Sequence, residues 1–441
     1  MGESLEIVLY TDQITTRLNY VLDFISEGQV ISFRPTNDVQ LFEAAKQPKL
    51  VYSDRYFDAG YAQISPADLL FQEGIQPVAV KWKNEHLLVD GKTDLLAAIF
   101  YVLTNYSDYL VKEEYKDKHG RVPAKFNVLF KGGQHHKLMV ERWSKQFLEY
   151  LKDSLSLDIS IAPQPFLFTP TFDIDIAYAY REKEKWRALM SKAKDMITFN
   201  KERLKEREAV LAEKSTDPYD TYAQIRTLQE KGIHPCVFWL LGDYTNYDRN
   251  IDFENPVQQA LINSLCSVAT IGIHPSYKSN EVLGQLEKEI NRLTEVTGEK
   301  VSHSRQHFLK VSLPKTYKWL VKVGITHDYT LGFAETYGFK VGTVRPHSWF
   351  NLENDQVTNL TLHPFAYMDG SLLEYQHLSP EQAQVSIQAL FDEVATFGGE
   401  FSFIWHNSTI GDYGKWKGWK AVFEHTINLF LQHQDHAKNR G

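Results

Sequence analysis

Two aspartates close the segment Phe168-Thr-Pro-Thr-Phe-Asp-Ile-Asp175, which reads as an apolar strand. Because side chains alternate along a strand, Asp173 and Asp175 are expected to share one face. Two carboxylates at such a short distance repel each other unless a cation or a shared proton balances their charge. A divalent metal does this, and one carboxylate can then bind the ion while the other takes a proton from water. A solvated pair of aspartates at a strand end fits the same residues, so downstream residues must decide.

Imidazoles and one guanidinium follow in the same pattern. His274 ends the β-rich run Val268–Ile273 and precedes a proline, and His406 ends the apolar run Phe401–Trp405. Arg305 and His307 stand just before another apolar run, Phe308–Val311, which is predicted to be a strand. Side chains at the carboxyl ends of barrel strands meet at one site. One aspartate and two histidines suit zinc or another divalent ion with open positions.

The elements that must position these residues alternate between strand and helix, which predicts a parallel sheet or a (β/α) barrel. The predicted strands are 166–173, Pro235–Leu241, Val268–Ile273, Phe308–Val311 and Phe401–Trp405. The predicted helices are Lys183–Lys214, Thr221–Glu230, Pro256–Leu265, Glu281–Thr297, Pro314–Val323 and Pro380–Phe397.

The first third of the chain forms a separate unit in this interpretation. Strands are expected over 4–10 and 49–53, and helices over Asp94–Asn105 and Leu138–Leu155. The composition changes to β-branched residues and proline near 156–163, which indicates a boundary. We therefore predict a smaller α/β domain of unknown role over residues 1–158 and a second domain over 159–441. The first domain has no chemical motif, and its pair His135-His136 is interpreted as an exposed polar loop.

Bulk composition excludes several classes of protein. The formal net charge is -8 over 441 residues and no basic block is present, so a nucleic-acid partner is not expected. No run approaches 18 apolar residues, so no membrane span is expected. The start lacks a basic region followed by a long apolar region, so a cytoplasmic location is the expectation. Cys236 and Cys266 both lie in apolar runs and are interpreted as small core residues.

The order of these motifs resembles the polysaccharide deacetylase (NodB-type, carbohydrate esterase family four) superfamily. The branch that it resembles most is common in Bacteroidetes and has an extra N-terminal domain. The resemblance covers roughly residues 160–435, and more loosely 5–150. The phrases that carry it are Asp217-Pro-Tyr-Asp-Thr-Tyr222, Ile271-Gly-Ile-His-Pro-Ser-Tyr277, Ser304-Arg-Gln-His-Phe-Leu309, Gly324-Ile-Thr-His-Asp-Tyr-Thr-Leu-Gly-Phe333 and Gly342-Thr-Val-Arg-Pro-His347.

The resemblance implies a distorted (β/α)7 barrel and metal-dependent hydrolysis of an N-acetyl or O-acetyl group on a sugar. By this resemblance Asp173 matches the catalytic base and Asp175 a metal ligand. His274 matches the first metal histidine, Arg305 the arginine that orients the base, and His406 the general acid. Zinc is the expected metal, and an acetylated carbohydrate is the expected substrate.

One position departs from the family pattern. The second metal histidine of the family lies four residues after the first, where this chain has Lys278. An ammonium group cannot ligate a metal and opposes one nearby. His307 is the predicted substitute, and His303 is a weaker candidate. Two alternatives therefore stay open beside a deacetylase: a glycan-binding or scaffold protein that retains the barrel without catalysis, and a metal-dependent amidase of a small non-sugar substrate.

Overall fold

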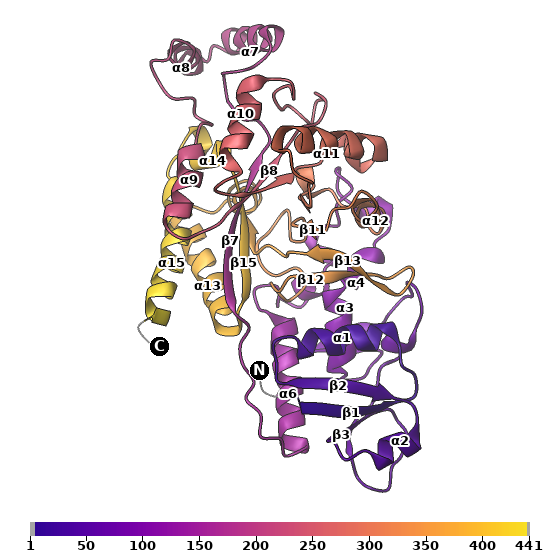
Figure 1. Cartoon of the computed structure of the whole chain (residues 1–441). Coiled ribbons are helices and arrows are strands. Elements are labelled where there is room, and N and C mark those ends of the chain that lie inside the picture. Colours follow the sequence, from indigo (N-terminus) through magenta and orange to yellow (C-terminus); the bar gives the residue numbers. More distant parts are fainter. Residues whose placement is uncertain (1–4, 439–441) are drawn as a thin grey trace.

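The computed structural model describes residues 5–438, which fold into two parts (Figure 1). Each part has a large hydrophobic core. The N-terminal core lies against a parallel sheet of order β2-β1-β3-β4. Its strands, with a separate hairpin, are β1 (Leu5–Thr11), β2 (Ile31–Thr36), β3 (Lys49–Tyr52), β4 (Ala62–Ile64), β5 (Val80–Lys83) and β6 (His86–Val89). Its helices are α1 (Thr16–Ser26), α2 (Val39–Ala44), α3 (Leu95–Leu103), α4 (Tyr106–Tyr109), α5 (Val128–Lys131) and α6 (Met139–Ser154).

The larger part is built on a nine-stranded sheet of order β12-β13-β11-β10-β9-β8-β7-β15-β14. All neighbouring strands are parallel except the antiparallel pair β12 and β13. The strands are β7 (Phe166–Ile174), β8 (Cys236–Trp239), β9 (Thr270–Ile273), β10 (His303–Ser304), β11 (His327–Asp328), β12 (His347–Asn351), β13 (Gln356–Leu362), β14 (Tyr367–Met368) and β15 (Gly399–His406).

Helices follow most of these strands, as βαβ connections require. They are α7 (Lys185–Ile197), α8 (Lys201–Leu211), α9 (Tyr222–Glu230), α10 (Pro256–Leu265), α11 (Leu283–Thr297), α12 (Lys315–Lys322), α13 (Pro380–Phe397), α14 (Asn407–Ile410) and α15 (Lys420–Lys438). The predicted α/β class is therefore confirmed. Within residues 5–438 the strand ladders form an open run from β12 to β14, and closure into a seven-stranded barrel stays a prediction.

The predicted strand Phe308–Val311 is wrong. Residues His307–Leu309 form a 3-10 turn, in which Phe308 and Leu309 have φ of 60° and 52°. Such left-handed dihedrals cannot continue a strand. The strand of this region is β10, which ends one residue before Arg305. Arg305 and His307 therefore follow the carboxyl end of a strand and do not precede one, so they lie at the same kind of strand end as the other candidate residues.

The predicted single helix Lys183–Lys214 is two helices, α7 and α8, which pack as a hairpin. The break lies at Thr198–Asn200, where Phe199 has φ of 51° and the Asn200 side chain caps α8 by accepting from the backbone N–H of Arg203. An asparagine that caps a helix from outside starts a new one. The charged composition gave no sign of this turn, since both helices contain several lysines and arginines.

Two smaller expectations also need correction. Cys236 is buried, but Cys266 is exposed at the end of α10. His135 and His136 are half-buried and not exposed, because the rings contact each other with centroids 4.0 Å apart and His136 stacks on Tyr337 at 4.9 Å.

The two parts of the molecule share contacts. The chain passes between them through residues 157–165, which form neither helix nor strand. Phe350 and Leu352, from the β12 region, belong to the N-terminal core. The buried Arg17 of α1 donates to Asp355 at 2.6 Å. The division into domains 1–158 and 159–441 stays a prediction, but the N-terminal core is incomplete without the β12–β13 hairpin.

Candidate functional site

The sheet brings the candidate residues to one edge. Asp173 and His406 are register partners on the neighbouring strands β7 and β15. His274 follows β9 and Arg305 follows β10, and these two strands are also neighbours. Because these strands are parallel, their carboxyl ends meet at the same edge. Residues from four separate stretches of the chain therefore line one pocket.

Asp173 is held by Arg305. Both side chains are buried, and the Arg305 Nη1 atom donates to Asp173 Oδ1 at 2.9 Å and to Thr171 Oγ1 at 2.6 Å. The Arg305 Nε atom donates to the Tyr329 carbonyl at 2.9 Å, so the guanidinium is fixed in its plane. Because Oδ1 is engaged, Oδ2 is the Asp173 oxygen left for other chemistry.

Asp175, His274 and His307 converge. One ligand atom from each lies within 4.8 Å of the other two. The Asp175 Oδ1 atom is 3.3 Å from His274 Nε2 and 3.6 Å from His307 Nε2. Both imidazoles are buried, and the Asp175 side chain is about one-third exposed toward the pocket.

Hydrogen bonds on the far side of each ring fix which nitrogen is free. The His274 Nδ1 atom is 2.6 Å from the carbonyl oxygen of Arg305, which can only accept. The His307 Nδ1 atom is 2.9 Å from a carboxylate oxygen of Asp248, which is fully buried. Each Nδ1 therefore carries a hydrogen, and Nε2 is the nitrogen that faces the pocket. Burial lowers the pKa of His307, but Asp175 and Asp248 raise it to about 9, so without a cation its Nε2 holds a proton at neutral pH, and a bound metal would take the place of that proton. This arrangement orients metal-binding histidines in proteins.

The pocket therefore fits a cation. Two Nε2 lone pairs face the Oδ1 atom of Asp175, and that buried oxygen has no hydrogen-bond partner among the described residues. Such an arrangement is repulsive unless a proton or a metal lies between the three atoms. Partial burial raises the pKa of Asp175, but His307, His274 and His406 outweigh it and hold that pKa well below its usual range. Two histidines and one carboxylate with open positions are a common set for zinc.

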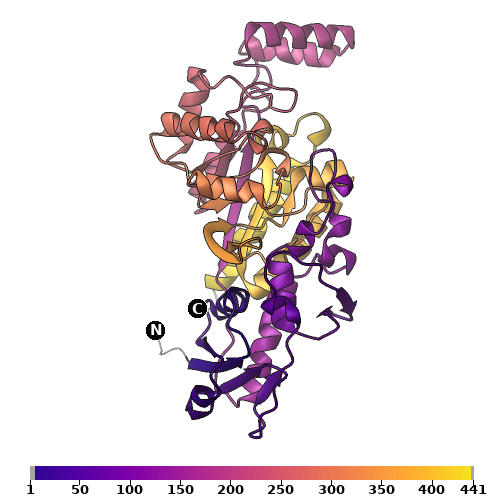
Figure 2. The ribbon, with the colours of Figure 1, turned by 90° about the vertical axis from the view of Figure 1, so that its right-hand side faces the viewer.

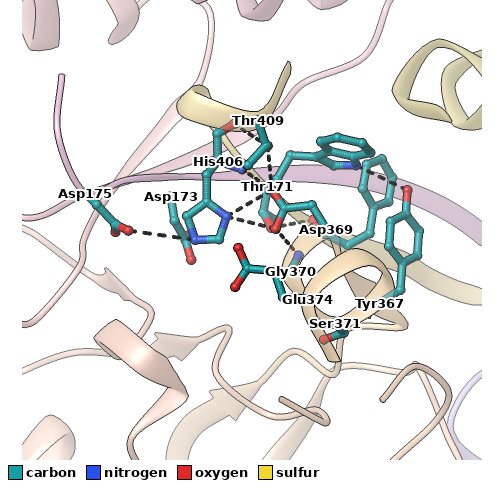
Figure 3. A network of polar contacts seen from close by, with 12 residues as sticks. Thr171, Asp173, Asp175, Tyr367, Asp369, Gly370, Ser371, Glu374, His406 and Thr409 are labelled. Carbon is teal, nitrogen blue, oxygen red and sulfur yellow. Dashed lines mark hydrogen bonds and ion pairs between the residues drawn. The ribbon is translucent and has the colours of Figure 1, made fainter. Parts of the chain in front are cut away.

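His406 faces the same pocket from β15 and is held by Asp369 (Figure 3). Its Nδ1 atom lies 2.9 Å and 3.0 Å from the two oxygens of the buried Asp369, and its Nε2 atom lies 4.0 Å from Asp175 Oδ2. Asp369 also accepts from the Gly370 N–H and the Thr409 hydroxyl. Burial lowers the pKa of His406, but Asp369, Asp175 and Asp173 together raise it to about 10. His406 is therefore a proton donor at neutral pH.

A cavity of about 370 Å³ connects these groups. Aromatic rings and one arginine form its outer walls: Tyr219, Phe308, Tyr375, Trp416 and Arg121. Arg121 comes from the N-terminal part, and it donates to the Phe308 carbonyl at 3.0 Å and to the Tyr375 hydroxyl at 3.1 Å. The pocket thus has an acidic and imidazole-rich floor and a largely aromatic rim.

Lys278, which departs from the family pattern, and the weaker candidate His303 both lie outside the donor set. Lys278 is exposed and does not line the cavity, so its ammonium group is kept away from the three donor atoms. His303 lies two residues before Arg305 and packs inside the sheet, where it stacks on His327 with ring centroids 4.6 Å apart. The structure therefore brings together Asp173, Arg305, His406 and the donor set with His307, and it leaves His303 outside.

Sequence reasoning missed Asp248 and Asp369. Asp369 follows the short apolar stretch Phe365–Met368 and precedes a glycine, which is the same strand-end pattern that marked Asp173. That signal could have found it. Asp248 lies in the irregular segment between β8 and α10, where nothing in the spacing separates it from neighbouring polar residues.

Comparison with known proteins gives the following. Residues 7–156 match the model of a family of unknown function, DUF7033. No curated protein matches the chain. A candidate polysaccharide deacetylase from Mycobacterium smegmatis is 14% identical, with a TM-score of 0.39 over 62% of this chain and 86% of that one.

Two further solved structures are similar over a comparable share of this chain. A family 4 carbohydrate esterase from Streptomyces lividans is 10% identical, with a TM-score of 0.30 over 63% of this chain and 91% of that one. A CE4-family pseudoenzyme from Bacillus anthracis is 9% identical, with a TM-score of 0.31 over 62% and 63%.

Proposed function

We propose that this protein is a hydrolase that removes N- or O-acetyl groups from a carbohydrate with the help of a divalent metal. One observation carries the proposal. An arginine-held aspartate and an aspartate-held histidine line the same pocket as a convergent Asp/His/His set. A binding module needs a shaped pocket but has no use for a base, an acid and their orienting partners together.

Asp173 is the proposed base. Its Oδ1 atom accepts from Arg305, so a proton from an attacking water would go to Oδ2, which lies 3.9 Å from His274 Nε2 at the donor set. The buried guanidinium keeps the carboxylate in one orientation. Proton transfer to a positioned base of this kind contributes typically about 10²–10⁴-fold to a rate.

His406 is the proposed acid. The raised pKa keeps a proton on both ring nitrogens at neutral pH, with Nδ1–H directed to Asp369 and Nε2–H directed into the pocket. Nε2 can therefore protonate the amine or alkoxide that leaves when the acetyl group is cleaved. Base and acid come from register partners on adjacent strands, which fixes the distance between them.

Asp175, His274 and His307 are the residues that would hold the metal. A divalent ion held there would supply Lewis-acid chemistry, which polarises an acetyl carbonyl and lowers the pKa of water. The aromatic rim offers apolar ring faces of the kind that sugar rings pack against, and the cavity of about 370 Å³ has room for a sugar-sized group. An acetylated carbohydrate is therefore the substrate class that this pocket supports best, and zinc the metal.

The test is acetate release. Chelator-stripped protein is given zinc, cobalt or manganese together with small N- and O-acetylated oligosaccharides, and acetate is measured. Asp173→Asn keeps the size of the side chain and removes the proton acceptor, so we expect it to retain metal and to lower turnover by about 10²–10⁴-fold. Asp175→Asn should lose both metal and activity. Asp392→Asn, on an exposed face of α13, is the matched control and should change neither.

Three outcomes would count against the proposal. Glycan binding without acetate release for any metal would favour the scaffold alternative. Hydrolysis of small non-sugar amides alone would favour the amidase. Loss of metal in Asp173→Asn, with metal retained in Asp175→Asn, would mean that the two aspartates have each other's roles.

A further inference from the structure

The α7–α8 hairpin carries a stripe of exposed apolar side chains. The hairpin projects from the molecule at the end opposite the N-terminal part (Figures 1 and 2). Six large apolar side chains on α7 and the turn that follows it are between 50% and 82% exposed, which is unusual for residues of these types. They are Trp186, Leu189, Met190, Met196, Ile197 and Phe199.

These residues share one face of α7. Each residue advances a helix by about 100°, so positions 186, 189, 190, 196 and 197 fall within a sector of about 120°. Phe199 continues the stripe into the turn. Three exposed lysines border it: Lys185 and Lys192 on one side and Lys194 on the other. An apolar stripe with lysines at both edges is typical of helices that lie at a lipid–water interface.

The two helices of the hairpin contact each other through polar side chains, whereas the helices of an ordinary hairpin pack through apolar ones. The face of α7 that meets α8 presents Asp195 and Ser191, and both side chains bind the buried Arg207 of α8. Arg203 adds a second contact to Asp195 at 3.6 Å. An ion pair therefore holds the hairpin together, while its largest apolar side chains point outward. Such an arrangement suits a hairpin whose outer face meets an apolar phase.

The charge of the hairpin differs in sign from the rest of the chain. Residues 185–211 hold eight Lys or Arg and four Asp or Glu, a net charge of +4 within a chain of -8. The remaining residues therefore carry -12. Two hairpins of +4 would repel each other, which disfavours a second copy of this chain as the occupant. Anionic lipid attracts such a segment and repels the rest of the molecule, so the charge also sets which side of the protein faces the lipid.

We infer that the α7–α8 hairpin docks this protein on the surface of a membrane that contains anionic phospholipid. The apolar stripe enters the boundary between headgroups and acyl chains, and the flanking lysines stay with the lipid phosphates. Within residues 5–438 no helix could cross a bilayer, so the contact is peripheral.

The place where the hairpin joins the sheet decides which side of the protein would face the membrane. The chain leaves β7 at Asp175 and enters α7 ten residues later, so the hairpin rises from the same end of the sheet as the pocket. Arg187 fixes its base by donating to the carbonyl oxygens of Arg249 and Asn250. A membrane bound by the hairpin would lie on the side of the molecule where the pocket opens. The docking goes beyond the proposed hydrolysis and does not depend on it.

Co-sedimentation of the full chain with vesicles tests this. We expect binding to vesicles of equal parts phosphatidylglycerol and phosphatidylcholine, weakened by salt, and little binding to phosphatidylcholine alone. Leu189→Glu with Ile197→Glu should lower the bound fraction at least tenfold. Replacing Lys185, Lys192 and Lys194 by Gln should lower it at least roughly tenfold, since each lysine near an anionic surface contributes about fivefold.

A matched double variant, Leu41→Glu with Val385→Glu, changes equally exposed apolar side chains on α2 and α13 and should leave binding unchanged. All these positions are exposed, and circular dichroism checks that each variant folds. No binding to the anionic vesicles overturns the inference. So does binding that the hairpin variants do not alter, or a doubled mass by light scattering that the Leu189/Ile197 variant abolishes, which would show a second copy as the occupant. Acetate release from soluble sugars should be equal in all variants, so failure here is distinct from failure of the proposed hydrolysis.

Discussion

Four reactive side chains of the pocket, Asp173, His274, His307 and His406, are each positioned by one buried partner. Arg305 has two such duties, because its guanidinium holds Asp173 and its carbonyl oxygen accepts from His274 Nδ1. Asp248 orients His307, and Asp369 orients His406. The partners contribute no chemistry to substrate themselves, but they decide which atom of each functional group faces the cavity.

Asp369→Asn tests this positioning through pH. Asp369 is the main group that raises the pKa of His406 to about 10, so its loss lowers that pKa. His406 must be protonated to act as an acid, and its proton would then be lost at lower pH. We expect turnover to fall and the alkaline limb of the pH–rate profile to move to lower pH. Asp369→Glu should restore part of both. A fall in rate with an unmoved alkaline limb would contradict this role.

Residue patterns predicted the reactive side chains better than their partners. Asp173, Asp175, His274 and His406 stand at the ends of apolar runs, and a run of that kind signals a strand end in a single sequence. His307 was predicted only because Lys278 left a ligand missing. Asp248 could not be predicted, because its role arises from the fold of an irregular segment against a histidine 59 residues away.

Among the elements, the loop that carries Arg121 connects the two parts of the molecule. It reaches from the N-terminal part to the pocket rim, where Arg121 is held by Asp117 at 2.7 Å and donates to the Phe308 carbonyl and the Tyr375 hydroxyl. The N-terminal part is therefore a wall of the pocket as well as a neighbour of the sheet.

Arg121→Ala should loosen that rim. Because Arg121 positions two rim residues and lies outside the base, the acid and the donor set, we expect KM for an acetylated oligosaccharide to rise several-fold with kcat nearly unchanged. Lys118→Ala, an exposed change on the same loop, is the control. A loss confined to kcat would instead mean that Arg121 acts on the reacting groups.

Element length explains part of which strands could be predicted, although the five-residue β12 and the seven-residue β13 were also missed. The nine-residue β7 and the eight-residue β15 are long enough for an apolar run to be visible. The strands β10, β11 and β14 have two residues each, which is too few for any periodicity to be visible. In place of β10, the sequence predicted a strand over the apolar residues just after it. The apolar residues of 308–311 line the pocket rim or pack beneath it. No periodicity rule separates such a segment from a short strand.

At the scale of the whole molecule, the interface between the two parts contains a buried histidine. His347 of β12 packs edge-to-face on Phe24 of α1, and its Nδ1–H donates to the Arg345 carbonyl at 2.9 Å. Burial lowers the pKa of His347 to about 4, and the nearby Arg345 charge adds to this effect. The folded protein therefore holds this ring neutral in mildly acidic solution.

Stability should depend on pH through this ring. Unfolding returns the pKa of His347 to about 6.5, so between pH 6.5 and 4 the unfolded chain binds a proton that the folded chain does not. The contribution of His347 to the free energy of unfolding is complete above pH 6.5 and is lost as pH falls toward 4. Between pH 7 and 5 the free energy of unfolding should fall by about 2 kcal/mol for this reason. Urea unfolding of the native protein and His347→Gln at both pH values should show a smaller pH dependence in the variant. Equal dependence would contradict the prediction.

The β12–β13 hairpin also has a consequence for biosynthesis. Phe350, Leu352 and Asp355 complete a core whose other members end near Ile159, about 190 residues earlier in the chain. At translation rates of about 5–20 residues per second, the ribosome needs roughly 10–40 s to supply them. During that interval α1 lacks the hairpin that packs on it and the carboxylate that binds Arg17. Although the N-terminal part emerges first, it can mature only after most of the second part has been made.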